Sequence, residues 1–406
     1  MALKQLSIKS FTVLADGLDN PKGLCFAPDG SLYVTEAGIG GSGANLPSAS
    51  GQGDLYYGTS GAITKIQNGT VKRVLTGLPS LAFLDGTGAA GPHDIKFDAT
   101  GKPYVLIGYA ANPGFRDTTL GQTDLGKIIT PDFDTNSWTT IADIAGYELA
   151  NNPDGDEVIS NPLALLIDGD EIVVVDAGAN DLLSVGTDGS DLKAIAVLPK
   201  LTLTNPIFPG SNSQLFDKGH VPPAEAYRNA PPTELAIQPV PTSIAKGPDG
   251  AYYLSQFTGF PFPEGEAKIY RIDANGQITV YADGFTQVVD LVFDAEGNLY
   301  VLQHMNHSGW KGKRDGSLIK IAPNRTRTTV LSGNGLESPT ALTIGPDGAV
   351  FVINRGGCPG QGQVIRIEGS SFVPEPTPVL NGSVLNVATN GTQTTLLPSP
   401  TLIQQR

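Results

Sequence analysis

Oxygen-bearing side chains recur in this sequence at the point where a short apolar run ends. Glu36 closes the first such run, and the aligned position in later runs carries Ile107, Asp176, Gln256, Gln303 and Asn354. Carboxylate and amide oxygens are the ligands that hard divalent cations prefer, and calcium takes roughly six to eight of them. We therefore expect Glu36, Asp176, Gln303 and Asn354 to contribute to a metal site.

We call these aligned positions the strand-end column. A second set of aligned positions, the entrance column, lies just before the apolar run that precedes each of them in the chain. Its members are Asn20, Gly91, Asn161, Val240, Gln287 and Ser338, and Asp94 and Asp290 follow shortly after two of them. Asn161, Asp94 and Asp290 join the expected ligand set. The competing interpretation is a solvated channel, in which polar side chains only hydrogen-bond to water.

Histidine gives a second possible chemistry. The chain has four, His93, His220, His304 and His307, and the repeat described below places all of them on the face that carries the two columns. His93 with the His304/His307 pair would form an imidazole site for copper, iron or zinc, or supply a general base near neutral pH. Candidate catalytic residues are thus His93, His304, His307 and Glu36. The alternative is that these histidines are ordinary surface-loop residues.

Aromatic residues accompany these groups in the long connections. Tyr56, Tyr57, Tyr109, Phe257 and Trp310 are expected to form a rim over the polar floor, which would suit a flat, partly apolar small molecule. The alternative is that these rings form small cores of the loops themselves. Nucleophile-elbow, P-loop and dinucleotide motifs are missing from the strand and helix contexts that they need, which argues against serine-hydrolase and nucleotide chemistry.

The elements that must position these side chains are revealed by one turn that recurs six times. Its copies are Pro28–Gly30, Asp98–Gly101, Asp168–Asp170, Pro248–Gly250, Asp294–Gly297 and Pro346–Gly348, each between two strand-like runs. Asp-Gly pairs are favoured in hairpins because the turn requires positive φ. The later copies recur at about the 40–50 residues of a four-stranded blade. The sequence predicts an all-β, six-bladed β-propeller of the NHL or SMP-30-like kind over residues 11–373.

Closure of the ring is predicted from its two ends. The sixth repeat lacks a convincing fourth strand after residues 362–367, whereas residues 11–18 look like the fourth strand at 280–285. An N-terminal strand completing the last blade would remove exposed sheet edges. Residues 1–10 then form a leader or cloning remnant, and residues 374–406, rich in Thr, Asn, Gly and Pro, form a flexible tail.

The amino-acid composition agrees with this architecture and limits the classes of possible binding partner. Among 406 residues there are 50 Gly and 31 Pro, yet 40% are hydrophobic, as expected for many short strands and tight turns. The formal net charge of −14 disfavours nucleic acid and anionic membranes. No run approaches the roughly 18 apolar residues of a membrane span. Cys25 and Cys358 leave one disulfide or two free thiols open.

Residues 11–24 and 28–38, with the glycine-rich segments 40–43 and 50–53, resemble the ScyD/ScyE-type proteins of cyanobacterial scytonemin gene clusters; these residues do not separate the two branches, of which we favour ScyE. Weaker matches at 91–94 and 160–162 extend the resemblance over residues 11–373. The resemblance implies export to the periplasm and a late step in making scytonemin, an indole-phenol sunscreen dimer. In the ScyE branch this step would be oxidative coupling of two monomers.

Two departures accompany the resemblance. The export signal of the family is absent from the chain, and residues 373–376 look like the start of a sorting tail without the apolar helix that should follow. The leading functional hypothesis is an exported enzyme that couples a flat indole-phenol with the help of a divalent metal, either calcium or a redox metal such as copper or iron. The alternatives are a non-catalytic scaffold propeller and a calcium-dependent, lactonase-like hydrolase.

Overall fold

Six antiparallel sheets of four or five strands form the main body of the described residues. The computed structural model describes residues 11–209 and 231–368, so the expected leader and tail, as well as His220, lie outside the described residues. Blade 1 contains β2 (Pro21–Phe26), β3 (Leu32–Glu36), β5 (Asp54–Gln67) and β6 (Thr70–Ala82), with β4 (Asn45–Pro47) added against β5. Blade 2 contains β7 (Pro92–Phe97), β8 (Pro103–Ile107), β9 (Lys127–Asp132) and β10 (Ser137–Asp143). Blade 3 contains β11 (Pro162–Asp168), β12 (Glu171–Asp176), β13 (Asp181–Gly186) and β14 (Lys193–Val197).

The second half of the chain repeats the pattern. Blade 4 contains β17 (Pro241–Lys246), β18 (Tyr252–Gln256), β19 (Ala267–Ile272) and β20 (Ile278–Phe285). Blade 5 contains β21 (Val288–Phe293), β22 (Leu299–Gln303), β23 (Asp315–Ile321) and β24 (Arg327–Glu337). Blade 6 contains β25 (Ala341–Ile344), β26 (Val350–Asn354), β27 (Gly362–Ile367) and β1 (Phe11–Leu18).

The remaining elements lie in the connections. They are a separate hairpin of β15 (Leu201–Thr204) and β16 (Glu234–Ile237), the short helices η1 (Pro113–Phe115), η2 (Arg116–Leu120) and η3 (Gly309–Lys311), and the α-helix α1 (Ile144–Asn151). No helix in the part of the chain that the structure describes is long and apolar enough to cross a membrane.

The innermost strands of the six blades form a closed ring. Going round it, β2, β7, β11, β17, β21 and β25 each contact the next, and β25 contacts β2 again. The predicted six-bladed propeller is confirmed. The recurring turns join the first and second strand of each blade, and Gly30 and Gly348 adopt φ of 79° and 76°, the conformation for which glycine is favoured there.

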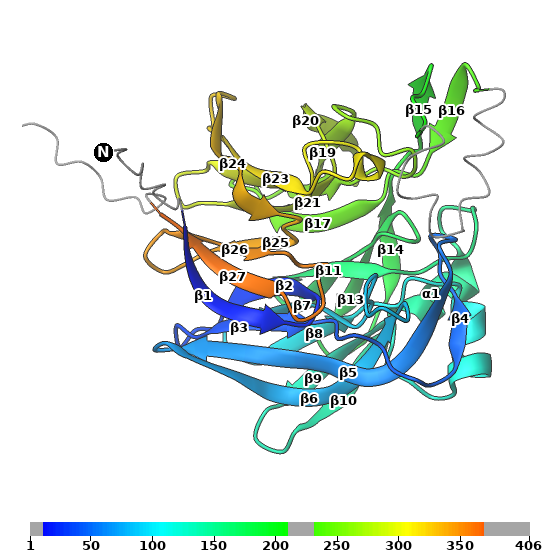
Figure 1. Cartoon of the computed structure of the whole chain (residues 1–406), viewed down its shortest axis with the longest axis vertical. Coiled ribbons are helices and arrows are strands. Elements are labelled where there is room, and N and C mark those ends of the chain that lie inside the picture. Colours follow the sequence, from blue (N-terminus) through cyan, green and yellow to red (C-terminus); the bar gives the residue numbers. More distant parts are fainter. Residues whose placement is uncertain (1–10, 210–230, 369–406) are drawn as a thin grey trace, which may run out of the picture. The chain divides into compact units, whose positions relative to one another are not determined.

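The N-terminal strand closes the ring as predicted. β1 runs antiparallel to β27 with Phe11 opposite Ile367 and Leu18 opposite Gly362, and Figure 1 shows the two strands side by side. Phe11 packs into the apolar cluster between blades 5 and 6, while Ala15 and Leu18 join the one between blades 6 and 1. Blade 6 therefore combines residues from both ends of the propeller sequence.

Candidate functional site

Adjacent blades are joined by a hydrogen bond between a side chain and the backbone at every step around the ring. The donors and acceptors are Thr35 to the His93 carbonyl, Leu165 N–H to Asp94, Val240 N–H to Asn180, Thr242 to the Val288 carbonyl, Leu342 N–H to Asp290, and Thr340 to the Pro21 carbonyl. Two of the expected metal ligands, Asp94 and Asp290, are thus used to hold the ring together.

The charges of these two aspartates are balanced by a lysine near the ring axis. Lys96 Nζ lies 2.6 Å from Asp94 Oδ1. Burial lowers the pKa of Lys96, but the Asp94 carboxylate, with a smaller contribution from Asp290 in the opposite blade, outweighs it and the net shift is upward. Burial raises the pKa of Asp290 to about 6, against the hydrogen bonds from Ser243 and Leu342. The lysine supplies the positive charge for which a divalent cation was expected.

Glu36 and Asp176, the two carboxylates of the strand-end column, turn towards their own blades. Glu36 accepts hydrogen bonds from Arg73 and Thr64 and from the Asp19 N–H. Asp176 accepts bonds from the Ser160 hydroxyl and from three backbone N–H groups, that of Asn161 at 2.6 Å. These oxygens stabilise the chain segment that leads into the innermost strand.

The amide side chains of the strand-end column also accept hydrogen bonds from backbone N–H groups. Gln303 Oε1 accepts from the Thr286 N–H at 2.8 Å, and Asn354 Oδ1 from the Glu337 N–H at 2.7 Å. Asn161 differs, because its Oδ1 is buried without a hydrogen-bond partner in the described structure. Over residues 11–209 and 231–368, no group of three or more His, Cys, Asp or Glu side chains is arranged to hold a metal ion.

His93 lies in the ring interior with one nitrogen fixed. Its Nδ1 is 2.8 Å from the Pro162 carbonyl of blade 3, so Nδ1 carries the proton and Nε2 is left as an acceptor. The ring lies directly on Gly108, where a Cβ would come within 2.0 Å of it. Burial lowers the pKa of His93 to about 4, with a further contribution from the Lys22 ammonium, although the carbonyls of Pro162 and Ala89 favour the charged form.

His304 repeats this arrangement between blades 5 and 6. Its Nδ1 is 2.9 Å from the Pro339 carbonyl, which again leaves Nε2 as the acceptor. Burial lowers the pKa of His304 to about 4; the Pro339 carbonyl opposes this, while Lys22 and Arg314 lower it further. Unlike His93, which is 3% exposed, His304 is partly accessible. It is therefore the imidazole that a ligand can reach.

Lys22 is the central residue that sequence reasoning missed. It lies on the inner strand of blade 1, yet its charge acts on His93 in blade 2, His304 in blade 5 and Cys358 in the β26–β27 loop of blade 6, so its ammonium faces these blades across the ring. Burial lowers its pKa to about 8, opposed by Cys358. A signal existed: Lys22 and His93 both follow the proline that begins an inner strand, two positions beyond the entrance column.

Cys358 and Arg314 complete what we call the axial cluster, which consists of Lys22, His93, His304, Arg314 and Cys358. Arg314 Nη1 donates to Cys358 Sγ at 3.3 Å. Both cysteines are free, so of the two options left open by the sequence, two thiols is correct. The cluster combines cations, neutral imidazoles and a thiol, and it has no carboxylate of its own.

The expected aromatic rim is only partly assembled. The Phe257 ring lies 5.9 Å from the His304 ring and 6.0 Å from Phe262, and Trp310 Nε1 donates to the Pro261 carbonyl at 2.9 Å. Phe257 and Trp310 therefore belong to one aromatic group beside His304.

The three tyrosines lie elsewhere. Tyr109 is fully buried in the core shared by blades 1 and 2, so its assignment to a rim was wrong. Tyr56 and Tyr57 lie on β5, where Tyr57 lines a surface groove of about 460 Å³ together with residues 40–43. The sequence could not separate these positions, because an aromatic residue in a long connection packs equally well inward or outward.

His307 is separated from His304 by its own contacts. Its Nδ1 lies 3.5 Å from Glu264, which also accepts from Lys311 at 2.7 Å and from the Ser308 N–H at 2.8 Å. This network joins the loop after β18 to the loop after β22. The H-x-x-H spacing thus reflects one histidine at the axial cluster and one in a contact between loops.

A second polar constellation lies at the edge of blade 3. Glu148 of α1 and Asp181 of β13 are both 1% exposed, and none of their carboxylate oxygens has a hydrogen-bond partner among the described residues. Burial raises the pKa of Glu148 to about 7, and the neighbouring carboxylates of Asp176 and Asp154 add to this. Burial likewise raises the pKa of Asp181. Glu148 is therefore suited to holding a proton near neutral pH, and burial favours the protonated form of Asp181 in the same way.

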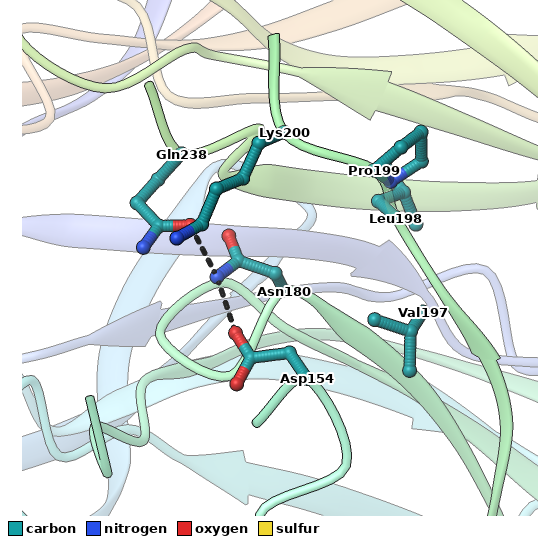
Figure 2. Close-up of a pocket in the computed structure, with 7 residues that line it drawn as sticks. All are labelled: Asp154, Asn180, Val197, Leu198, Pro199, Lys200 and Gln238. Atoms are coloured by element: carbon teal, nitrogen blue, oxygen red, sulfur yellow. Dashed lines mark hydrogen bonds between the residues drawn. The ribbon is translucent and has the colours of Figure 1, made fainter. Parts of the chain in front are cut away.

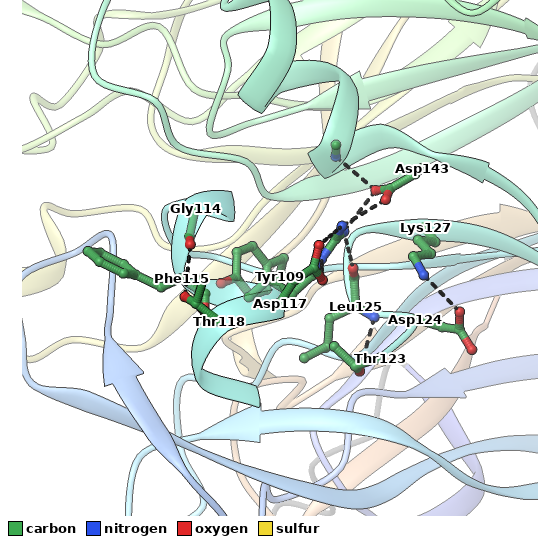
Figure 3. A network of polar contacts seen from close by, with 12 residues as sticks. Tyr109, Gly114, Phe115, Asp117, Thr118, Thr123, Asp124, Leu125, Lys127 and Asp143 are labelled. Carbon is green, nitrogen blue, oxygen red and sulfur yellow. Dashed lines mark hydrogen bonds and ion pairs between the residues drawn. The ribbon is translucent and has the colours of Figure 1, made fainter. Parts of the chain in front are cut away.

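Helix α1 is anchored in this position by a buried arginine. Arg116 donates to both carboxylate oxygens of Asp143, at 2.8 and 2.7 Å, and to the Leu125 carbonyl at 3.0 Å. Asp143 in turn caps α1 by accepting from the Gly146 N–H. Figure 3 shows Asp143 at the start of this helix, within the polar network. The capped helix brings Glu148 to the edge of blade 3.

A cavity of about 290 Å³ adjoins this region. Asp154, Asn180, Lys200 and Gln238 are among its lining residues, and Asn180 donates to both Asp154 and Gln238 (Figure 2). Its polar groups are largely bonded to one another. None of the axial cluster lines this cavity.

Comparison with known proteins agrees with the propeller fold and assigns no function to the chain. No family model and no curated protein matches the chain. A streptogramin B lyase structure matches with a TM-score of 0.43 and 13% identity over 87% of this chain and 96% of that one. A putative gluconolactonase gives a TM-score of 0.46 and 11% identity over 88% and 92%. A gluconolactonase from Xanthomonas campestris gives 0.45 and 11% over 88% and 89%. At this level of similarity, function must be argued from the site itself.

Proposed function

We propose that the axial cluster binds a flat small molecule that carries an indole and a phenol group, and that His304 accepts a hydrogen bond from its indole N–H group. The observation that carries this proposal is the fixed tautomer of the two imidazoles. Since each Nδ1–H is bonded to a backbone carbonyl, each Nε2 can only accept, and phenol O–H and indole N–H groups can only be matched by an acceptor.

Charge in the cluster favours the deprotonated form of such a ligand. Lys22 and Arg314 are the nearby cations, and the cluster contains no carboxylate that would repel a phenolate. With a pKa of about 8, Lys22 can take a proton from an acidic phenol in mildly alkaline solution and then stabilise the phenolate as an ammonium. Phe257 beside His304 provides an aromatic face for the ligand.

The finer proposal is that the ligand is the indole-phenol monomer of scytonemin and that the protein acts on it after export. Phenolates lose electrons more readily than phenols, so a site that holds the phenolate prepares two monomers for oxidative coupling. A redox metal would accept the electrons of the coupling, and the residue that would hold it is His93, whose Nε2 is buried without a partner.

Calcium fits the described side chains less well. The carboxylates of Glu36, Asp94, Asp176 and Asp290 each accept backbone N–H bonds or bonds from a cation. A calcium-dependent hydrolase shares the fold but would need these oxygens as ligands, so we rank it below the proposal above.

The test compares two histidines in one loop. Binding of the monomer would be measured by calorimetry, and dimer formation by mass spectrometry in air with copper or iron supplied. His304→Ala is expected to weaken binding at least tenfold and abolish dimer formation, whereas the matched control His307→Ala should retain both. Equal effects of the two substitutions would overturn the assignment of His304. A wild-type protein that binds the monomer without converting it would support the scaffold alternative.

A further inference from the structure

We propose that Glu148 and Asp181 bind a calcium ion between helix α1 and blade 3, with the side-chain oxygen of Asn152 as a further ligand. None of these residues belongs to the axial cluster or to the strand-end column, and the inference does not rest on the proposed function. The ion has a structural role, because it fastens α1 to the propeller.

The packing of α1 on blade 3 brings together Glu148 and Asp181, which we call the acidic pair. Ile144 of α1 and Leu183 of β13 belong to the same apolar cluster between blades 2 and 3. Glu148 follows Ile144 by four residues, so it lies on the same face of the helix one turn further on, and both side chains are buried. Asp181 precedes Leu183 by two residues, so it lies on the same face of the strand. The acidic pair therefore lies beside the contact between these two apolar side chains.

All carboxylate oxygens of the acidic pair are buried without a hydrogen-bond partner among the described residues, and no other described carboxylate has both of its oxygens in this state. Asn152, one turn after Glu148, adds a further oxygen. Its N–H donates to the Glu148 carbonyl at 2.9 Å and its Nδ2 to the Asp156 carbonyl at 2.9 Å, whereas its Oδ1 is buried and has no partner. Buried oxygens that lack a donor are costly, and when several lie together they indicate a cation that satisfies them.

The charge around the acidic pair also favours a cation. The carboxylates of Asp154 and Asp176 lie close enough to act on both members of the pair. Lys200 is bound by Asp156 instead, and no described side chain donates to the pair. A divalent cation neutralises the two formal charges of the pair. Without the ion, burial and the neighbouring carboxylates raise the pKa of both members, so that protons take its place.

The types of ligand select calcium. All of them are oxygens, which disfavours the soft metals that prefer sulfur and nitrogen. Magnesium keeps several of its water molecules, whereas calcium takes roughly six to eight oxygens and accepts bidentate carboxylates. Two bidentate carboxylates and the Asn152 amide supply most of this number. Because only two of the three residues are carboxylates, such a site is compatible with the absence of any group of three His, Cys, Asp or Glu ligands among the described residues.

The cavity of about 290 Å³ provides access to the acidic pair. Asp154 lines this cavity, and so does Asn180, the residue before Asp181 in the chain (Figure 2). The ion can therefore reach the pair from this side, and water that enters the cavity can supply its remaining ligands.

Calcium titration of the full-length protein tests the proposal. After removal of metal with EGTA, the wild-type protein should bind calcium in calorimetry, and its unfolding temperature should rise when calcium is added. Glu148→Gln and Asp181→Asn each remove a charged ligand, so each should weaken calcium binding roughly tenfold or more. Both variants should fold in EGTA, because each removes a buried charge. Glu157→Gln changes an exposed carboxylate that follows α1 and is the matched control, which should leave calcium binding unchanged.

Hydrogen exchange locates the ion. Amides of α1 (Ile144–Asn151) should exchange more slowly when calcium is added to the wild-type protein, and they should not respond in Glu148→Gln. Asp290→Asn changes a carboxylate at the ring interior and should leave both the calcium affinity and this response intact. The proposal is overturned if the wild-type protein binds no calcium, or if binding is lost in Asp290→Asn but retained in Glu148→Gln and Asp181→Asn.

Discussion

Arg73 holds Glu36 by two hydrogen bonds, from Nε to Oε1 at 2.9 Å and from Nη2 to Oε2 at 2.5 Å. Glu36 is fully buried, whereas Arg73 is 43% exposed at its side chain and comes from the fourth strand of the same blade. The most obvious metal ligand in the sequence is therefore the acceptor in an ion pair that joins the second strand of blade 1 to its outer strand.

This ion pair predicts that replacing Arg73 lowers the free energy of unfolding more than replacing Glu36. Arg73→Met leaves a buried carboxylate without its cation and should lower the free energy of unfolding by about 3 kcal/mol. Glu36→Gln keeps a neutral acceptor and frees an arginine that can reach solvent, so it should cost only about 1–2 kcal/mol. Urea denaturation of both variants measures this. If calcium restores the stability of Arg73→Met, then Glu36 binds metal and our assignment of its role is wrong.

Closure of the ring can be tested with two neighbouring positions of β1. Phe11 is buried between blades 5 and 6, and Phe11→Ala should cost about 3 kcal/mol. Val13→Ala, at a position that is 39% exposed, is the control and should change stability by about 0.5 kcal/mol or less. Similar denaturation midpoints for the two variants would show that β1 contributes little to blade 6.

Packing of His93 on Gly108 gives a third prediction. A methyl group at position 108 would come within 2.0–2.7 Å of the imidazole, so Gly108→Ala should displace the ring, cost about 1–3 kcal/mol and weaken ligand binding at the axial cluster. Gly357→Ala is the control, because a Cβ there meets no atom within 4 Å. Calorimetry and thermal unfolding would detect the difference; a Gly108→Ala protein with wild-type stability would argue against this packing.

The free energy of unfolding should change with pH because Glu148 titrates. Its pKa is raised to about 7 in the folded state, so its favourable contribution is complete below the unfolded value of about 4.5 and is lost as pH rises through 7. Glu148→Gln should therefore unfold at a higher temperature than wild type at pH 8.5 and at a similar one at pH 5. A constant difference between the two proteins across this range would contradict the proposed proton uptake.

Much of the fold could be predicted because the turns specify it. A hairpin requires positive φ at particular positions, and the Asp-Gly pairs ending at residues 30, 250 and 348 report that requirement directly. The closing strand was recognisable because residues 11–18 repeat the pattern of an outer strand. Both signals are local, so a single sequence contains them in full.

The site was less predictable because side-chain direction depends on partners far away in the sequence. Glu36 turns to Arg73 and Asp94 to the Leu165 N–H, and neither partner is marked by any spacing from the residue that it binds. Tyr109 packs into the core for the same reason. Lys22 escaped notice because a single lysine in a strand usually reaches solvent, and only closure of the ring brings it near blades 2, 5 and 6.

The register of the closing strand also determines how the ring responds to mechanical force. Because Phe11 pairs with Ile367, the start of β1 and the end of β27 lie at the same edge of blade 6. A force that pulls these two residues apart acts across the ladder and breaks its hydrogen bonds one after another, instead of loading them all together in shear. The strand that completes the propeller should therefore be the first to peel away under tension, at a modest force, while the five blades formed from continuous segments remain folded.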